Sequence, residues 1–169
     1  MSEIHSDYII TGSTYPGENS GIEELVKVGA KLIFVHGIVS DRRGGKLLRL
    51  LDDISGYGII PGIATHDPIP TVKYCIENSL SVRVFLIPFN ANGMLMGDVK
   101  KLELIVDKTK NFHFIGMKTL AAGEIEPEVA YQYIANHNIC AVTIGMVNKQ
   151  QAVESTKIAL KAFNNKSLK

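Results

Sequence analysis

The chain has 169 residues and a formal net charge of +1, from 18 basic and 17 acidic side chains, and 46% of its residues are hydrophobic. This length predicts one domain over residues 1–169, and the composition excludes a largely disordered chain. The even charge balance gives no reason to expect nucleic acid or an anionic membrane as a partner. The first seven residues are polar, without the apolar core of a signal peptide, so we expect a cytoplasmic protein.

Short apolar runs alternate with amphipathic segments in the first half of the chain. The apolar runs predict strands at residues 8–11, 32–35 and 59–64, and the third of these stops abruptly at Thr65, His66 and Asp67. Helical spacing of apolar residues predicts helices at 22–28 and 46–55. Pro70 suits the first turn of a third helix, which ends at Asn78.

The second half of the chain repeats the same pattern. Strands are predicted at residues 82–87, 112–117 and 140–144. Asp98 is a suitable N-cap for a helix that reaches Thr109, Pro127 opens the next helix, and Asn148 caps a final helix at 149–163. A strand followed by a helix, repeated about six times without hairpin signals, predicts a parallel sheet with right-handed crossovers.

Two architectures fit this pattern. An open doubly wound sheet usually carries a glycine-rich phosphate loop after its first strand, but residues 11–17 match neither GxGxxG nor a Walker loop. We therefore predict a parallel (β/α) barrel of TIM type that is partial, with about six βα units. A complete barrel has eight units in typically about 250 residues. An unclosed sheet exposes its edge strands, so we expect the protein to be a homo-oligomer.

Polar residues follow the ends of the predicted strands. In parallel α/β folds these ends meet at one rim, where ligands bind. We expect a small-molecule site there, and the candidate residues in chain order are His36, Thr65, His66, Asp67, Asn90, Lys118, Gly145 and Asn148.

The chemistry of these residues allows several roles. A neutral His36 imidazole can polarise a carbonyl group or transfer a proton. Lys118, between apolar neighbours, can act as a Schiff-base nucleophile in a lyase or aldolase. His36, His66 and Asp67 form an acceptable ligand set for a divalent metal. The segment from Gly145 to Asn148 leads into a helix N-terminus, which can bind a phosphate group.

Five segments resemble parts of the aldo-keto reductase superfamily, in the same order. Residues 32–37 resemble the strand that ends in the family's active-site histidine, and residues 58–66 resemble its next strand. Residues 84–90 resemble the strand with a terminal Pro-aromatic-Asn, residues 119–123 resemble a Pro-Leu-x-x-Gly turn, and residues 141–151 resemble the last strand with its phosphate-binding helix cap.

The resemblance implies a (β/α)8 barrel that transfers hydride from NADPH to a carbonyl compound. It implies the histidine role for His36 and contacts with the nicotinamide amide for Thr65 and His66. The family's catalytic Asp and Tyr belong to two units that this chain lacks, and its lysine position falls near Gly12. The catalytic set is therefore degenerate. A lyase using Lys118, or a non-catalytic barrel fragment serving as an assembly subunit, are the alternatives.

Overall fold

The computed structural model describes residues 8–164, and the first seven residues, on which the expectation of a cytoplasmic protein rests, lie outside that range. Six parallel strands alternate with helices, so the predicted α/β class is confirmed. The strands are β1 (Thr11–Ser13), β2 (Leu32–Val35), β3 (Ile60–Ala64), β4 (Val84–Pro88), β5 (His113–Met117) and β6 (Ile139–Val142). They pair in chain order, which makes β1 and β6 the two edges of the sheet.

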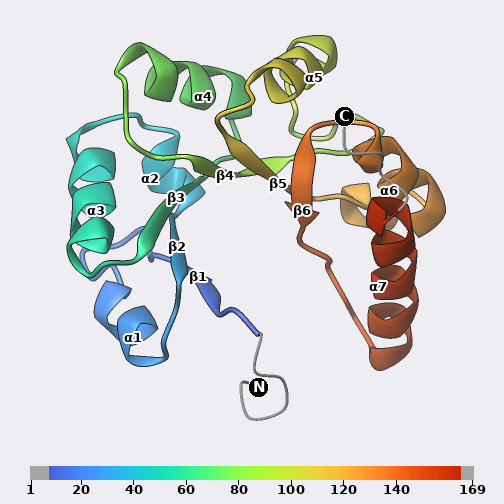
Figure 1. Ribbon diagram of the computed structural model, residues 1–169, viewed down its shortest axis with the longest axis horizontal. Coiled ribbons are helices and arrows are strands. Elements are labelled where there is room, and N and C mark those ends of the chain that lie inside the picture. The colour runs from blue at the N-terminus through green and yellow to red at the C-terminus, as the bar shows by residue number, and fades with distance from the viewer. Residues whose placement is uncertain (1–7, 165–169) are drawn as a thin grey trace.

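The helices occupy the connections between strands. They are α1 (Ile22–Lys27), α2 (Gly37–Ser40), α3 (Gly45–Gly56), α4 (Pro68–Glu77), α5 (Val99–Lys108), α6 (Pro127–Ala135) and α7 (Lys149–Asn164), with a 3-10 turn, η1, at Ala121–Gly123. The sheet curls into a half-barrel, and the larger helices lie on its convex side (Figure 1). Within residues 8–164, no helix is both long enough and apolar enough to span a membrane.

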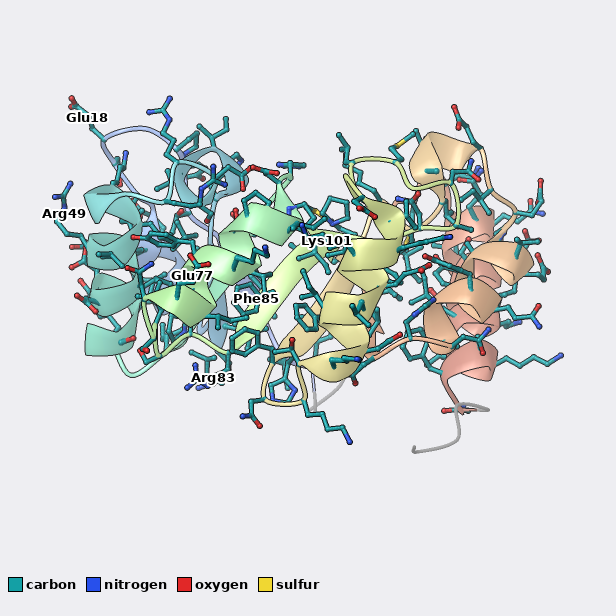
Figure 2. All side chains as sticks on the ribbon, turned by 90° about the horizontal axis from the view of Figure 1, so that it is seen from above. Glu18, Arg49, Glu77, Arg83, Phe85 and Lys101 are labelled. Atoms are coloured by element: carbon teal, nitrogen blue, oxygen red, sulfur yellow. The ribbon has the colours of Figure 1, made fainter. Side chains whose placement is uncertain are left out.

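The core lies between the convex face of the sheet and the helices. Strand register places one completely buried side chain from each of five neighbouring strands in a single row: Val35, Ile63, Phe85, Phe114 and Ile139. Buried helix residues such as Leu47 and Ile54 of α3 pack against this face. Figure 2 shows this helix layer from outside, with Phe85 between α4 and α5. The alternation of the strands therefore directs their most apolar residues toward the helices.

The concave face of the sheet is less completely buried. Its central part holds Phe34 of β2 and Ala64 of β3, which are both buried, and Gly62 of β3, which pairs with Phe34. A Cβ atom on Gly62 would lie 2.6 Å from the Phe34 ring, so the ring occupies the space that a larger residue would need. Toward the opposite end of β3, Ile60 on this face is 56% exposed. The face that a closed barrel would bury is thus open here.

Two predicted strands differ from the structure, and one short helix was not predicted. The first strand is β1 at Thr11–Ser13 rather than 8–11, because residues 11–13 are those that pair with β2, while Tyr8 and Ile9 remain exposed. The last strand is Ile139–Val142 rather than 140–144, with an irregularity in its register against β5. The short helix α2 had no sequence signal, since a four-residue helix is too short to show periodicity.

Candidate functional site

His36 lies directly after β2, at the carboxyl-end rim of the sheet. It is the N-cap of α2, and its Nδ1 accepts a hydrogen bond from the backbone N–H of Ile38 at 3.2 Å. Its own backbone N–H donates to the hydroxyl of Thr14, which follows β1, at 3.1 Å. Because Nδ1 acts as an acceptor, the neutral ring carries its hydrogen on Nε2. The predicted active-site histidine therefore has a fixed tautomer with a hydrogen-bond donor at Nε2.

The three polar residues after β3 have different roles. The Thr65 side chain is completely buried, and its hydroxyl donates to Asp41 while accepting from the backbone N–H of Asp67 at 3.0 Å. The side chains of His66 and Asp67 are exposed. Thr65 therefore supports the rim from inside, and His66 is the residue of this segment whose imidazole is accessible. A direct contact between Thr65 and a ligand stays a prediction.

Asp41 is at the centre of a hydrogen-bond network that the sequence did not reveal. Its carboxylate accepts from the hydroxyls of Thr65 and Thr71, the latter at 3.3 Å, and from the backbone N–H of His66 at 3.1 Å. Arg43 donates to Asp67 at 3.0 Å and to Thr71 at 3.4 Å. Asp41 is the C-cap of α2, in the turn between α2 and α3, and no spacing in the sequence relates it to residues some 25 positions later.

Asn90 follows β4, and its side chain is completely buried. Its Oδ1 accepts from the backbone N–H of Met94 at 2.8 Å, and its Nδ2 donates to the Met94 carbonyl at 3.0 Å. The amide therefore closes the loop between β4 and α5. A ligand contact by Asn90 stays a prediction. Such a contact would have to replace these two hydrogen bonds to Met94.

Lys118 follows β5, and its side chain is exposed. The ammonium group of Lys118 is therefore accessible to solvent rather than enclosed in an apolar pocket. Its backbone has φ of 56°, and Ala121 and Ala122, a few residues later, have φ of 45° and 61°. Left-handed backbone is unfavourable for residues other than glycine and is concentrated at functional segments. The end of β5 thus combines an accessible ammonium group with a strained backbone.

Gly145 and Asn148 lie between β6 and α7, and both are exposed. The Asn148 Oδ1 accepts from the backbone N–H of Gln151 at 2.9 Å, which confirms the predicted helix cap. The Gln151 side chain in turn accepts from the Val147 N–H at 3.3 Å. The backbone N–H groups of the first two helical residues have no partner within the helix, so they are the donors available at this end.

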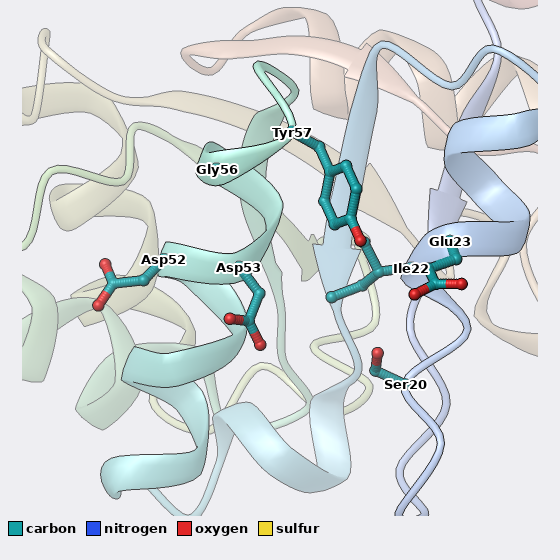
Figure 3. Close-up of a pocket in the computed structure, with 7 residues that line it drawn as sticks. All are labelled: Ser20, Ile22, Glu23, Asp52, Asp53, Gly56 and Tyr57. Atoms are coloured by element: carbon teal, nitrogen blue, oxygen red, sulfur yellow. The ribbon is translucent and has the colours of Figure 1, made fainter.

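No metal centre is built at this rim by the residues that the structure describes. No group of three or more His, Cys, Asp or Glu side chains in residues 8–164 is arranged to hold a metal ion, so the metal alternative based on His36, His66 and Asp67 is wrong for this structure. A hollow of about 450 Å³ lies elsewhere, beside α1 and α3 (Figure 3). Its lining includes Glu23, Asp52, Asp53 and Tyr57. Three of its lining residues are carboxylates, and none of the predicted rim residues lines it.

Comparison of the chain with protein-family models, with curated proteins and with solved structures gives no match. The resemblance to aldo-keto reductases therefore stays a prediction made from the residues. The geometry of the rim is the available basis for assigning a function.

Proposed function

We propose that the chain is an aldo-keto-reductase-like protein that binds a carbonyl compound at the rim and takes part in its NADP-dependent reduction. In this proposal the half-barrel corresponds to six units of a TIM-type barrel. The observation that supports it best is His36, whose capping bond leaves Nε2–H as a donor at the end of β2. A carbonyl oxygen is an acceptor and gains negative charge as it is reduced, so a preorganised N–H donor stabilises the transition state.

His66 complements His36 in this scheme. It follows the neighbouring strand β3, and its imidazole is exposed at the same rim. A protonated imidazole can donate a proton to the alkoxide that forms when a carbonyl is reduced. We assign this role to His66, because the units that supply a tyrosine acid in the family that the chain resembles have no counterpart within residues 8–164.

The fit to a nicotinamide cofactor differs between its two ends. The resemblance assigns the nicotinamide amide contacts to Thr65 and His66, but the Thr65 hydroxyl is already bound to Asp41. The Asn90 amide, another candidate ligand contact, is bound to Met94. The nicotinamide end therefore does not fit the residues as they stand, and we derive no step through the cofactor. The α7 N-terminus behind Asn148 offers backbone donors for a phosphate group. The α7 N-terminus and the resemblance to aldo-keto reductases are the two reasons for proposing NADP.

The test is titration of NADPH with the protein, followed by the change in nucleotide fluorescence. Asn148→Ala should weaken binding, because it removes the cap that shapes the α7 end. Asp98→Ala is the matched control: it removes the equivalent N-cap of α5, where Asp98 accepts from the Lys101 N–H at 3.1 Å. Asp98→Ala should leave the affinity unchanged. The absence of binding at millimolar NADPH would exclude the reductase function.

Schiff-base chemistry at Lys118 is the second candidate, favoured by the left-handed backbone at this lysine. Incubation with small aldehydes and borohydride should then trap a covalent adduct on the wild-type protein. The adduct should be lost in Lys118→Met and retained in Lys73→Met, which removes another exposed lysine. Equal labelling of the two variants would show that the reaction is not specific to Lys118.

A further inference from the structure

The segment that follows β2 holds the end of β3 from two sides. On one side, the Asp41 carboxylate accepts from the Thr65 and Thr71 hydroxyls and from the His66 backbone N–H. Thr65 and Thr71 are both completely buried, so water does not compete for their hydroxyl groups. Hydrogen bonds to an ionised carboxylate are stronger than those between neutral groups. Asp41 therefore fixes the backbone at the point where His66 leaves the sheet.

On the other side, the His66 ring lies against Gly37, the first residue of α2. A Cβ atom on residue 37 would be 2.8 Å from the His66 Nδ1 and 3.2 Å from its Cε1. No side chain other than hydrogen fits there without moving the ring. Glycine at position 37 leaves room for the imidazole, and the hydrogen bond from the His66 backbone N–H to Asp41 holds the residue that carries it.

These contacts connect the two histidines of the rim through one short helix. His36 caps the N-terminus of α2, Gly37 supports the His66 ring, and Asp41, the C-cap, binds the His66 backbone. Arg43, with a left-handed φ of 50°, extends the arrangement by binding Asp67 and Thr71. The segment from residue 36 to residue 43 therefore contacts all three polar residues that follow β3.

We propose that Asp41 is a positioning residue that acts through His66, holding the imidazole of His66 beside α2 so that it shares one ligand site with His36. The inference rests on the proposed function for the identity of the ligand. In this proposal the Thr65 hydroxyl binds Asp41 instead of the ligand, so the segment after β3 contacts the ligand through His66. This arrangement also explains why Thr65 is buried whereas His66 beside it is exposed.

The test follows the histidine imidazole signals by NMR in the ligand-free protein, with His66 assigned from a His66→Gln variant. Asp41→Asn places an amide N–H₂ among donors that need an acceptor, so it should shift the His66 signals. Asp52→Asn, an exposed aspartate on α3, is the matched control and should shift none of them. The signals of His113, at the far end of β5, should stay unchanged in both variants and report that the fold is retained.

Gly37→Ala provides a second test that does not alter Asp41. The added methyl group should displace the His66 ring and shift its signals, even if Asp41→Asn proves too unstable to study. His66 signals that coincide with wild type in both Asp41→Asn and Gly37→Ala would overturn the proposal, and a shift confined to His66 in either would support it. Because no ligand is used, a failure of NADPH binding would reject the proposed function without affecting this result.

Discussion

The Nδ1 of His36 accepts a hydrogen bond from the backbone N–H of Ile38 at 3.2 Å, so one imidazole both caps α2 and presents its other nitrogen at the rim. These two roles can be separated by substitution. His36→Asn should retain most of the stability, because asparagine is a good N-cap, whereas His36→Ala should lose about 1 kcal/mol. If the proposed reduction occurs, both variants should lose it, since neither has an Nε2–H donor.

Chemical denaturation measures the first effect, and NADPH consumption with a panel of simple aldehydes and ketones measures the second. A His36→Asn protein that keeps full reductase activity would show that the imidazole acts only as a cap.

Thr65→Val should destabilise the protein by about 1–3 kcal/mol, the cost of leaving buried polar groups without partners. Valine has a similar shape, but it removes the donor to Asp41 and the acceptor for the Asp67 N–H. Thr65→Ser retains the hydroxyl and should lose much less stability. Urea unfolding of the three proteins measures this difference, and equal midpoints for the two variants would show that the hydroxyl contributes nothing.

Two tyrosines of α6 provide a matched pair. The Tyr133 hydroxyl donates to Glu103 of α5 at 2.6 Å, and burial together with this bond and the charges of Glu103 and Asp107 raises the pKa of Tyr133. The Tyr131 hydroxyl is buried, and no group among the described residues lies in hydrogen-bonding geometry with it. Burial raises the pKa of Tyr131, and the nearby Thr119 hydroxyl offsets part of that effect.

Tyr133→Phe should therefore lower stability by about 1 kcal/mol, the net value of a typical hydrogen bond, while Tyr131→Phe should be neutral or stabilising. Thermal unfolding of both variants would compare them. A larger loss in Tyr131→Phe than in Tyr133→Phe would mean that Tyr131 has a strong partner.

The two cysteines should differ in reactivity. Cys75 of α4 is buried, and desolvation raises its pKa from 9.0 to about 12, whereas Cys140 of β6 is exposed. A thiol reagent should label Cys140 in the native protein and both cysteines after denaturation. Rapid labelling of native Cys140→Ser would contradict this assignment.

The raised pKa of Cys75 also predicts how the stability of the protein changes at alkaline pH. Its proton is held more tightly in the folded state, so its contribution is complete below about pH 9 and is lost as pH rises toward 12. The free energy of unfolding should fall in that window with a slope of up to about 1.4 kcal/mol per pH unit. Cys75→Ala, measured over the same range, should lack this component.

The expected self-association stays a prediction, and the structure identifies where to test it. The open concave face and the unpaired edges β1 and β6 are the surfaces that a second copy would cover. Native mass measurement should show a dimer or larger species. Ile60→Lys adds a charge to the concave face and should shift the protein toward monomer, whereas Leu104→Lys, at an exposed site on α5, should not. A monomeric wild-type protein would refute the prediction.

The sequence predicted the elements well where the pattern of apolar residues was clear. Helix α3 has apolar residues on one face, and β2 is a continuous apolar run that ends at His36; both were placed within one or two residues. The rim location of His36, His66, Asn90 and Lys118 followed from the parallel connection rule alone. Their orientation did not follow, because whether a side chain faces solvent depends on tertiary partners.

Asp41 shows why part of the candidate site was missed. An aspartate in a polar loop is ordinarily a solvated turn residue, and its local sequence gives no sign of the two buried threonines that donate to it. The same holds for Asn90, whose hydrogen bonds to the Met94 backbone close its own loop. Such contacts depend on strands brought together by folding, and one sequence without a structure does not specify them.

Within residues 8–164, each strand of the half-barrel pairs only with the strands that precede and follow it in the chain. Every crossover therefore closes locally, and assembly can proceed by adding one strand and one helix at a time to an existing edge. Each parallel pairing still requires a whole crossover to close, which is slower than forming a hairpin. The same arrangement means that a βα unit could be gained or lost at either edge without rethreading the others.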